Sequence, residues 1–233
     1  MAGAHLVAIS DLHLGQQFNL GAFKEFLQDL RKRVRPELLI LAGDILELAW
    51  FSWKELEKQK LFCDALDELR GVAAAIETWL IPGNHDPRKK LLPDRLTPIH
   101  IAPYDPQMGE AIVLDDIIFT HGAQFDVTTR FWDRLLKLPI KALLPCLYLR
   151  LYGTPYEVKS AYKEKDYREL VGWIMGRAMM CAIRQGKDVC FGHTHAPMTL
   201  DLGGRVIVNS GDWRDSLSYI EVLDGRMALR FWR

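Results

Sequence analysis

The chain has 233 residues, and 49% of them are hydrophobic, which is enough to bury a sizeable core in one domain or in one domain with an insertion. Its 30 Lys and Arg residues balance its 30 Asp and Glu residues, so no whole-chain field attracts nucleic acid or a membrane. The four cysteines have no C-x-x-C spacing, which argues against a disulfide framework and a thiolate zinc site. The N-terminal apolar run is short and lacks a basic flank, so we expect no signal peptide and a cytoplasmic protein.

Strands alternate with helices in the first part of the chain. An apolar run at residues 6–9 predicts a buried strand, helical spacing of apolar residues predicts a helix over 20–34, and residues 38–41 predict a second strand. Residues 52–55 have the form of a capping box that opens another helix, and a third strand is expected near 78–81. This order indicates an α/β fold.

The pattern changes to paired strands after this region. Residues 111–114 and 117–120 are apolar runs on either side of a short turn, and residues 218–223 and 227–231 form a similar pair. The later part of the chain therefore predicts antiparallel sheet next to the alternating strands and helices. We expect a mixed α/β protein.

Polar residues suited to metal binding follow five of the predicted strands. In chain order, the blocks are Asp11-Leu12-His13, Gly43-Asp44, Gly83-Asn84-His85-Asp86, His121-Gly122 and Gly192-His193-Thr194-His195. Loops at one edge of a sheet can converge on one crevice, which is where open α/β sheets bind ligands. A single block is typical of a turn or of a hydrogen-bonded core residue, but five together favour a shared metal site.

The last of these blocks carries two imidazoles. It follows the apolar run 189–191, and we expect its backbone to be extended. Side chains two residues apart point the same way along an extended strand, so His193 and His195 should be directed at one place.

The order of the five blocks resembles the calcineurin-like metallophosphoesterase superfamily over nearly the whole chain. The resemblance implies a four-layer α/β/β/α sandwich with two metal ions at one edge of its sheets. By matching motifs, one ion is held by Asp11, His13 and His195, the other by Asn84, His121 and His193, with Asp44 as the bridge. The two imidazoles of the last block thus hold different ions. His85 resembles the histidine that binds no metal and stabilises or protonates the leaving group, and Asn84 and His85 are also expected to contact the substrate.

These ligand types suit two divalent cations. Oxygen and imidazole donors without thiolates favour Mn²⁺, Fe or Zn²⁺, and among these we expect Mn²⁺. One anionic bridge holds two cations about 3.5–4 Å apart and leaves positions for a bridging water, which becomes hydroxide near neutral pH and attacks phosphorus. We therefore expect a hydrolase that acts on phosphoanhydride or phosphodiester bonds.

A segment between the fourth and fifth blocks is expected to be an inserted helical lid. We assign it to residues 125–185, on a metallophosphoesterase core made of residues 1–124 and 186–233. No apolar run in it approaches the ~20 residues that cross a bilayer. From Arg130 to Arg168, nine cations outnumber four anions and are interleaved with leucines and aromatics. This composition is typical of a solvated helical subdomain or of a lid for an amphiphilic substrate or membrane surface.

Two further stretches of sequence resemble one particular family within this superfamily. "GDILELAW" at 43–50 and "VNSGDWRDSLSYIEV" at 208–222 look like the UDP-2,3-diacylglucosamine pyrophosphatase family of lipid A synthesis, as does the position of the insertion. This likeness implies hydrolysis of the pyrophosphate of an amphiphilic nucleotide sugar, with peripheral contact at the inner membrane surface. The best-known members carry arginine at the position of His85, so this chain departs from them there.

The same likeness suggests substrate-binding residues in the lid. Lys165 is the best match for the family's basic residue near the phosphate, with Lys159 and Lys163 as neighbours. An apolar surface for the acyl chains is expected from Trp132, Leu135 and Leu136.

Three functions stay open at this stage. The first is the lipid-linked pyrophosphatase, the second is a phosphodiesterase or nuclease on soluble nucleotides or nucleic acid, and the third is a non-catalytic scaffold of the same fold, as in the retromer. The complete ligand set argues against the scaffold. Cations interleaved with apolar residues argue against an open nucleic-acid groove, so we do not expect nucleic acid as a partner. Gly43-Asp44 also lacks the D-R-G continuation of the protein phosphatases.

Overall fold

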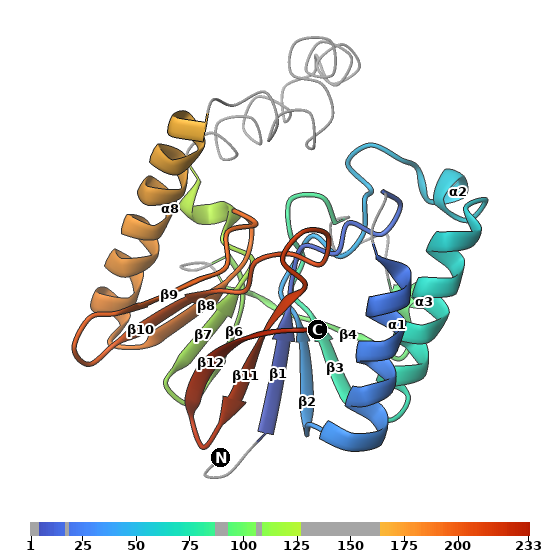
Figure 1. The fold of residues 1–233 in the computed structure, drawn as a ribbon, viewed down its shortest axis with the longest axis horizontal. Helices are drawn as coiled ribbons and strands as arrows, with labels where there is room; N and C mark the ends of the chain where they lie inside the picture. Colours follow the sequence, from blue (N-terminus) through green and yellow to red (C-terminus); the bar gives the residue numbers. More distant parts are fainter. Residues whose placement is uncertain (1–4, 17–18, 87–92, 106–108, 127–163) are drawn as a thin grey trace.

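The structure is a computed structural model that describes residues 5–16, 19–86, 93–105, 109–126 and 164–233. Two six-stranded sheets pack face to face, and helices cover the outer face of each sheet (Figure 1). The layers therefore follow the order helix, sheet, sheet, helix, and the expected mixed α/β sandwich is confirmed.

The first sheet has the strand order β12-β11-β1-β2-β3-β4. Its strands are β1 (His5–Ile9), β2 (Leu38–Leu41), β3 (Glu77–Leu80), β4 (His100–Ile101), β11 (Ser218–Leu223) and β12 (Arg226–Phe231). Neighbours from β1 to β4 pair in parallel, whereas β11 runs antiparallel to both β1 and β12. The first and last parts of the chain thus share one sheet.

The second sheet has the order β5-β6-β7-β8-β10-β9. Its strands are β5 (Tyr104–Asp105), β6 (Gly109–Leu114), β7 (Ile117–Thr120), β8 (Asp188–Phe191), β9 (Met198–Asp201) and β10 (Val206–Asn209). The predicted hairpin is β6 and β7, while β7, β8 and β10 pair in parallel. Sequence reasoning did not anticipate β4, β5, β9 and β10.

Five α-helices lie in the described residues. They are α1 (Leu20–Asp29), α2 (Trp53–Leu56), α3 (Lys60–Ala73), α4 (Pro93–Leu96) and α8 (Glu164–Gln185), with a 3-10 turn at Ala123–Phe125. The Asn19 side chain caps α1 by accepting the Ala22 N–H at 3.0 Å. The helix expected over 20–34 is α-helical to Asp29 and continues as a π-helix over Leu30–Val34.

Alternating side chains divide the core into layers. In β1, Val7 and Ile9 face α1 and α3, while Leu6 and Ala8 face the second sheet. Both faces of this strand are apolar because each is covered, as expected for a central parallel strand. The same alternation in β8 places Cys190 between the sheets and its neighbours against α8.

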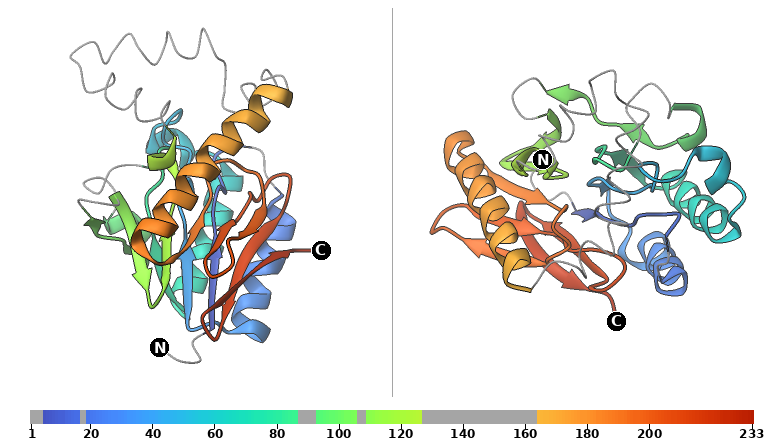
Figure 2. Two further views of the ribbon diagram at one scale, coloured as in Figure 1. Left: turned by 90° about the vertical axis from the view of Figure 1, so that its left-hand side faces the viewer. Right: turned by 90° about the horizontal axis from the view of Figure 1, so that it is seen from above.

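Helix α8 covers the outer face of the second sheet (Figure 2). Ile174, Ala178 and Ala182, four residues apart, belong to the same buried cluster as residues of β7, β8 and β10. The described end of the range 125–185 therefore packs on the sheet, whereas residues 127–163 lie outside the described part, and the division into core and lid stays a prediction. Within the described ranges, no helix combines the length and apolar character needed to cross a bilayer.

Candidate metal centre

The five polar blocks follow β1, β2, β3, β7 and β8, as the sequence predicts. Buried Asp86 joins two of the loops, because its carboxylate accepts the N–H groups of Leu46 at 2.8 Å and Gly83 at 2.9 Å. The His85 N–H donates to Asp44 Oδ1 at 2.8 Å. The block after β3 is therefore tied to the block after β2.

Several predicted ligands adopt a left-handed backbone conformation. Positive φ angles occur at Asp11 (54°), His13 (46°), Asp44 (52°), His193 (68°) and His195 (54°). Such angles are uncommon for side-chain-bearing residues and cluster at functional sites when surrounding contacts hold them. Here the backbone N–H groups of Asp11 and His13 donate to the carbonyls of Gly43 at 3.0 Å and Asp44 at 2.9 Å.

The block Gly192–His195 is bent, so the expectation of an extended backbone there is wrong. The Thr194 N–H donates to the Gly192 carbonyl at 2.8 Å, which closes a three-residue turn around His193. The His193 N–H donates to the Asp11 carboxylate at 3.0 Å. These bonds bend the chain at His193. As a result, the imidazoles of His193 and His195 lie in two different groups of side chains.

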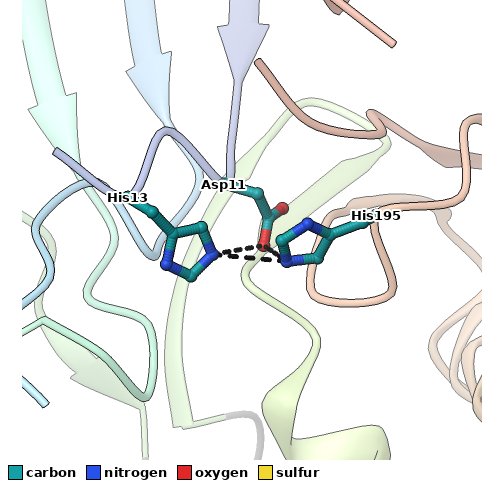
Figure 3. Close-up of side chains that lie close together, drawn as sticks. All are labelled: Asp11, His13 and His195. Carbon is teal, nitrogen blue, oxygen red and sulfur yellow. Dashed lines mark hydrogen bonds and ion pairs between the residues drawn. The ribbon is translucent and has the colours of Figure 1, made fainter. Parts of the chain in front are cut away.

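The first ligand group consists of Asp11, His13 and His195 (Figure 3). His195 Nε2 lies 3.3 Å from Asp11 Oδ1 and 3.3 Å from His13 Nε2. His13 Nε2 lies 3.9 Å from the same Asp11 oxygen. Donor atoms from the loops after β1 and β8 therefore converge within 4.8 Å of one another.

The second ligand group consists of Asp44, His121 and His193. His121 Nε2 lies 3.2 Å from Asp44 Oδ2 and 3.3 Å from His193 Nδ1. The Asn84 side-chain oxygen is 3.1 Å from His121 Nε2, and so joins this group. Asp44 Oδ2 is also 3.9 Å from His13 Nε2, which places Asp44 between the two groups.

Each ligand histidine has a partner on its other ring nitrogen. The pairs are His13 Nδ1 with Glu47 (2.7 Å), His195 Nδ1 with Asp212 (3.2 Å), His193 Nε2 with Asp126 (3.1 Å) and His121 Nδ1 with the Ala42 carbonyl (3.1 Å). A carboxylate or carbonyl only accepts hydrogen bonds, so each partnered nitrogen carries a proton and the opposite nitrogen is the one available to a cation. These opposite nitrogens are the ones that face each other inside the two ligand groups.

The charges in the centre are strongly coupled. Burial disfavours the charged form of Asp44, but the imidazoles of His121 and His85 outweigh it and hold the pKa of that carboxyl well below its usual range. Burial likewise opposes protonation of His121, yet the Asp44 carboxylate raises the pKa of His121 to about 9. Hydrogen bonds and charge from His195 lower the pKa of Asp212 despite its burial. Without a cation, protons stabilise this arrangement of closely spaced donors.

Two glycines allow the loops to approach this closely. A side chain at Gly83 would collide with the carboxylate and backbone of Asp44, and one at Gly192 would collide with Asp11 and Ser10. The glycines in these blocks therefore serve the packing of ligand loops against one another.

A sequence profile described as calcineurin-like phosphoesterase matches residues 4–197. This range includes all of the predicted ligands. The chain belongs to the calcineurin-like phosphoesterase family. No curated protein matches the sequence.

Solved structures are similar to this chain at low sequence identity. A dimetal phosphatase from Danio rerio is 10% identical, with both chains covered over 100% of their length and a TM-score of 0.50. A phosphoesterase from E. coli is 16% identical over 98% of this chain and 100% of that chain, with a TM-score of 0.48. Vps29 from Entamoeba histolytica in complex with Zn²⁺ is 13% identical over 97% of each chain, with a TM-score of 0.43.

Family membership and the two ligand groups support a metal-dependent phosphoesterase. The structure brings together every residue predicted to bind metal, although the assignment of each to an ion stays a prediction. His85 lies beside the two groups, with Nδ1 on Glu47 and Nε2 4.0 Å from Asp44 Oδ2, and its donor atom also converges with those of His13 and Asp44 in a third group. Among the predicted lid residues, Lys165 lies in the first turn of α8, but its side chain is outside the described part of the structure. The others lie outside it entirely: Lys159, Lys163, Trp132, Leu135 and Leu136.

Sequence reasoning missed the carboxylates behind the histidines. Glu47 and Asp212 lie inside the two stretches that carry the finer resemblance, and Asp126 follows His121 by five residues. A carboxylate near each ligand histidine is a common feature of metal sites, so these residues were candidates. Their partners are distant in sequence, and only the folded loops show which carboxylate serves which imidazole.

Proposed function

We propose that this protein is a dinuclear metal-dependent phosphoesterase that hydrolyses the pyrophosphate of UDP-2,3-diacylglucosamine or a similar lipid-linked nucleotide. The observation that carries the metal-dependent chemistry is the convergence of imidazole nitrogens and carboxylate oxygens. His13 Nε2 and His195 Nε2 lie 3.3 Å apart beside the Asp11 carboxylate, and His121 Nε2 and His193 Nδ1 lie 3.3 Å apart beside Asp44. Such electron-rich pairs are stable when a cation or a proton lies between them.

The residues fit two divalent ions. Asp11, His13 and His195 would hold one ion; Asn84, His121 and His193 would hold the other; Asp44 would bridge them. Oxygen and nitrogen donors without thiolates suit Mn²⁺, our first choice, and also Fe or Zn²⁺. When bound, the two ions would activate a water molecule and neutralise the phosphate oxygens.

His85 is positioned to move a proton. Burial opposes its protonation, but the nearby Asp44 carboxylate and the hydrogen bond to Glu47 raise the pKa of His85 to about 9. The imidazole therefore carries a proton at neutral pH, with Nε2 on the side of the metal centre. We assign it the donation of that proton to the leaving oxygen, and we assign Asn84 and His85 to the substrate phosphate.

Features next to the centre support a substrate with apolar parts. The partly buried Trp50 ring lies 6.5 Å from the His85 ring, centroid to centroid, which places an aromatic side chain next to the proposed proton donor. The Tyr167 hydroxyl of α8 donates to the carbonyl of Thr194, which lies between the ligands His193 and His195 in the chain. The end of the predicted lid therefore contacts the block that supplies both histidines.

The outer face of α8 supports peripheral contact with the inner membrane surface. Trp173, Met180 and Ile183 are 73%, 46% and 59% exposed, and Arg177 and Arg184 lie exposed beside them. Apolar and cationic side chains on one helix face are typical of helices that lie on anionic lipid. We therefore propose a cytoplasmic protein that works at the membrane.

The deciding experiment compares substrates on one purified protein loaded with Mn²⁺. UDP-2,3-diacylglucosamine, bis-p-nitrophenyl phosphate and cyclic nucleotides are assayed side by side, with chelator-treated protein as the control. We expect the lipid-linked substrate to have the highest kcat/KM and the chelated protein to be inactive. Preference for cyclic nucleotides would favour the soluble phosphodiesterase, and two bound ions without any hydrolysis would favour the scaffold.

A second version of the assay tests the predicted lid. Replacing residues 130–152 with a short polar linker should lower kcat/KM on the diacylated substrate, because each buried methylene contributes about 0.8 kcal/mol. Hydrolysis of bis-p-nitrophenyl phosphate should largely persist if the variant keeps its metals. Full activity of this variant on the long-chain substrate would contradict the lid assignment.

A further inference from the structure

Glu47 is a buried carboxylate that lies behind the metal centre. Its side chain has no exposed surface, although it carries charge. Burial opposes ionisation, but the hydrogen bonds from His13 and His85 hold the pKa of the Glu47 carboxyl below its usual value. The backbone N–H of Glu47 donates to the Leu14 carbonyl at 3.0 Å, which fixes the residue against the loop after β1.

The two oxygens of this carboxylate serve different histidines. Oε2 lies 2.7 Å from His13 Nδ1 and also accepts a hydrogen bond from Gln16 Nε2 at 2.7 Å. Oε1 lies 2.5 Å from His85 Nδ1. The rings of His13 and His85 are 4.9 Å apart and nearly perpendicular, at 85°. One side chain therefore connects a predicted metal ligand with the predicted proton donor.

An ionised carboxylate fixes where both imidazoles hold their protons. It accepts hydrogen bonds and donates none, so both His13 and His85 present an N–H at Nδ1. His13 is left with its Nε2 lone pair facing His195 and Asp11. His85 has its Nε2 on the side of Asp44, where a substrate phosphate would lie.

We propose that Glu47 is a positioning residue that couples metal binding to proton transfer. It holds His13 in the tautomer that would bind a cation through Nε2, and it holds the His85 ring against the same carboxylate, next to His13. This inference rests on the proposed phosphoesterase function for the role of His85. The tautomer part rests on the contacts of the Glu47 carboxylate with both Nδ1 atoms.

The other carboxylates behind the centre provide an internal comparison. Asp212 lies behind His195 and Asp126 lies behind His193. Each of those contacts orients a ligand histidine, whereas Glu47 contacts a ligand and His85 at once. Loss of Glu47 should therefore change both metal affinity and turnover, and loss of Asp212 should act through the metal.

The variant Glu47→Gln tests the proposal with little change in volume. An amide has one acceptor oxygen and an NH₂ group, so it can accept from one of the two imidazoles while its NH₂ opposes the other N–H. Titration of metal-free protein with Zn²⁺ in a calorimeter should show roughly 10–100-fold weaker binding at one of the two sites. Glu25→Gln, an exposed glutamate on α1, is the matched control and should bind as the wild type does.

Turnover at saturating Mn²⁺ tests the coupling to His85. With bis-p-nitrophenyl phosphate, Glu47→Gln should lower kcat by a factor of roughly 10² or more, within the range for a misplaced general acid, and change KM little. In a His85→Ala background the same substitution should lower kcat much less, because the group that it positions is gone. Equal losses in both backgrounds would overturn the coupling.

A spectroscopic measurement on the wild type needs no variant. In Zn²⁺-loaded protein labelled with ¹⁵N-histidine, His13 and His85 should both show a proton at Nδ1. If either ring carries a proton at Nε2 and none at Nδ1, the proposal is overturned. This test remains valid even if Glu47→Gln fails to fold. If the wild type hydrolyses no phosphoester but both rings show the expected protons, the proposed function fails while the positioning role of Glu47 stands.

Discussion

The two ligand groups of the metal centre differ in how they are supported. The first group, Asp11 with His13 and His195, has a carboxylate behind each histidine. In the second group, Asp126 lies behind His193, but His121 is oriented by a neutral backbone carbonyl. The side chain of His195 is 26% exposed, whereas that of His121 is 3% exposed.

This difference indicates a division of tasks within one centre. The first group has more negative charge behind its ligands, and it contacts His85 through Glu47. The second group holds Asp44, which both groups share. We therefore expect the second group to determine whether the centre assembles and the first group to determine how fast it turns over. Four experiments test this distinction, beginning with the largest effect.

Removal of Asp44, the carboxylate that both groups share, should affect the two groups equally. Asp44→Ala takes a ligand from both groups, so we expect the loss of both ions and of activity, whereas His13→Ala should mainly empty the first group. Elemental analysis of both variants after dialysis gives the metal content. Two full equivalents in Asp44→Ala would contradict the bridging assignment.

Removal of the proton donor should affect turnover and leave both groups filled. His85→Ala should keep two ions while kcat falls roughly 10²–10⁴-fold, as for loss of a general acid. The measurement pairs steady-state kinetics with metal content. Loss of an ion would instead make His85 a ligand, and unchanged kcat would remove it from the mechanism. His85→Arg then tests whether this chain accepts the residue found in the lipid A enzymes that it resembles.

Neutralising a single supporting carboxylate should weaken metal binding in only one of the two ligand groups. Asp212→Asn should lower affinity in the first group and Asp126→Asn in the second, each by roughly 10–100-fold. Calorimetric titration of metal-free protein with Zn²⁺ resolves the two steps. If both substitutions weaken the same step, the carboxylates do not act on separate ions.

The metal-free protein should become less stable as the solution becomes alkaline. His85 and His121 have pKa values raised to about 9 in the fold, above the value of about 6.5 in an unfolded chain. Their contribution to stability is therefore complete below about pH 6.5 and is lost as pH rises toward 9. Urea unfolding at several pH values measures the trend, and Mn²⁺ should reduce it because His121 gives up its proton to bind. A flat profile in metal-free protein would show that these imidazoles are not held protonated.

Much of the fold was predictable because a buried strand appears in the sequence as a short apolar run. The runs 6–9 and 38–41, and the polar blocks that follow them, can be recognised without knowing any tertiary contact. Helix α8 was harder, because exposed Trp173 and Ile183 obscure the spacing of its buried residues. Its apolar residues lie on both faces, so periodicity alone did not separate it from the predicted lid.

The supporting residues of the site could not be found in the same way. Glu47 is a supporting residue because it contacts His85, and Asp212 is one because it contacts His195. Both contacts form between loops that meet only in the folded protein. The bend at His193 likewise depends on a hydrogen bond to Asp11, which lies 182 positions away in the chain. Local propensity contains no information about such partners.

The pairing of β1 with β11 has a consequence for how the protein is made. One edge of β1 is covered by β2 and the other by residues 218–223, which come much later in the chain. During synthesis that second edge stays open to other chains until β11 has been made, which favours aggregation of the nascent protein and slows folding. Asp11 likewise meets His195 only after the loop that follows β8 has been made, so the first ligand group cannot be complete before that point of synthesis.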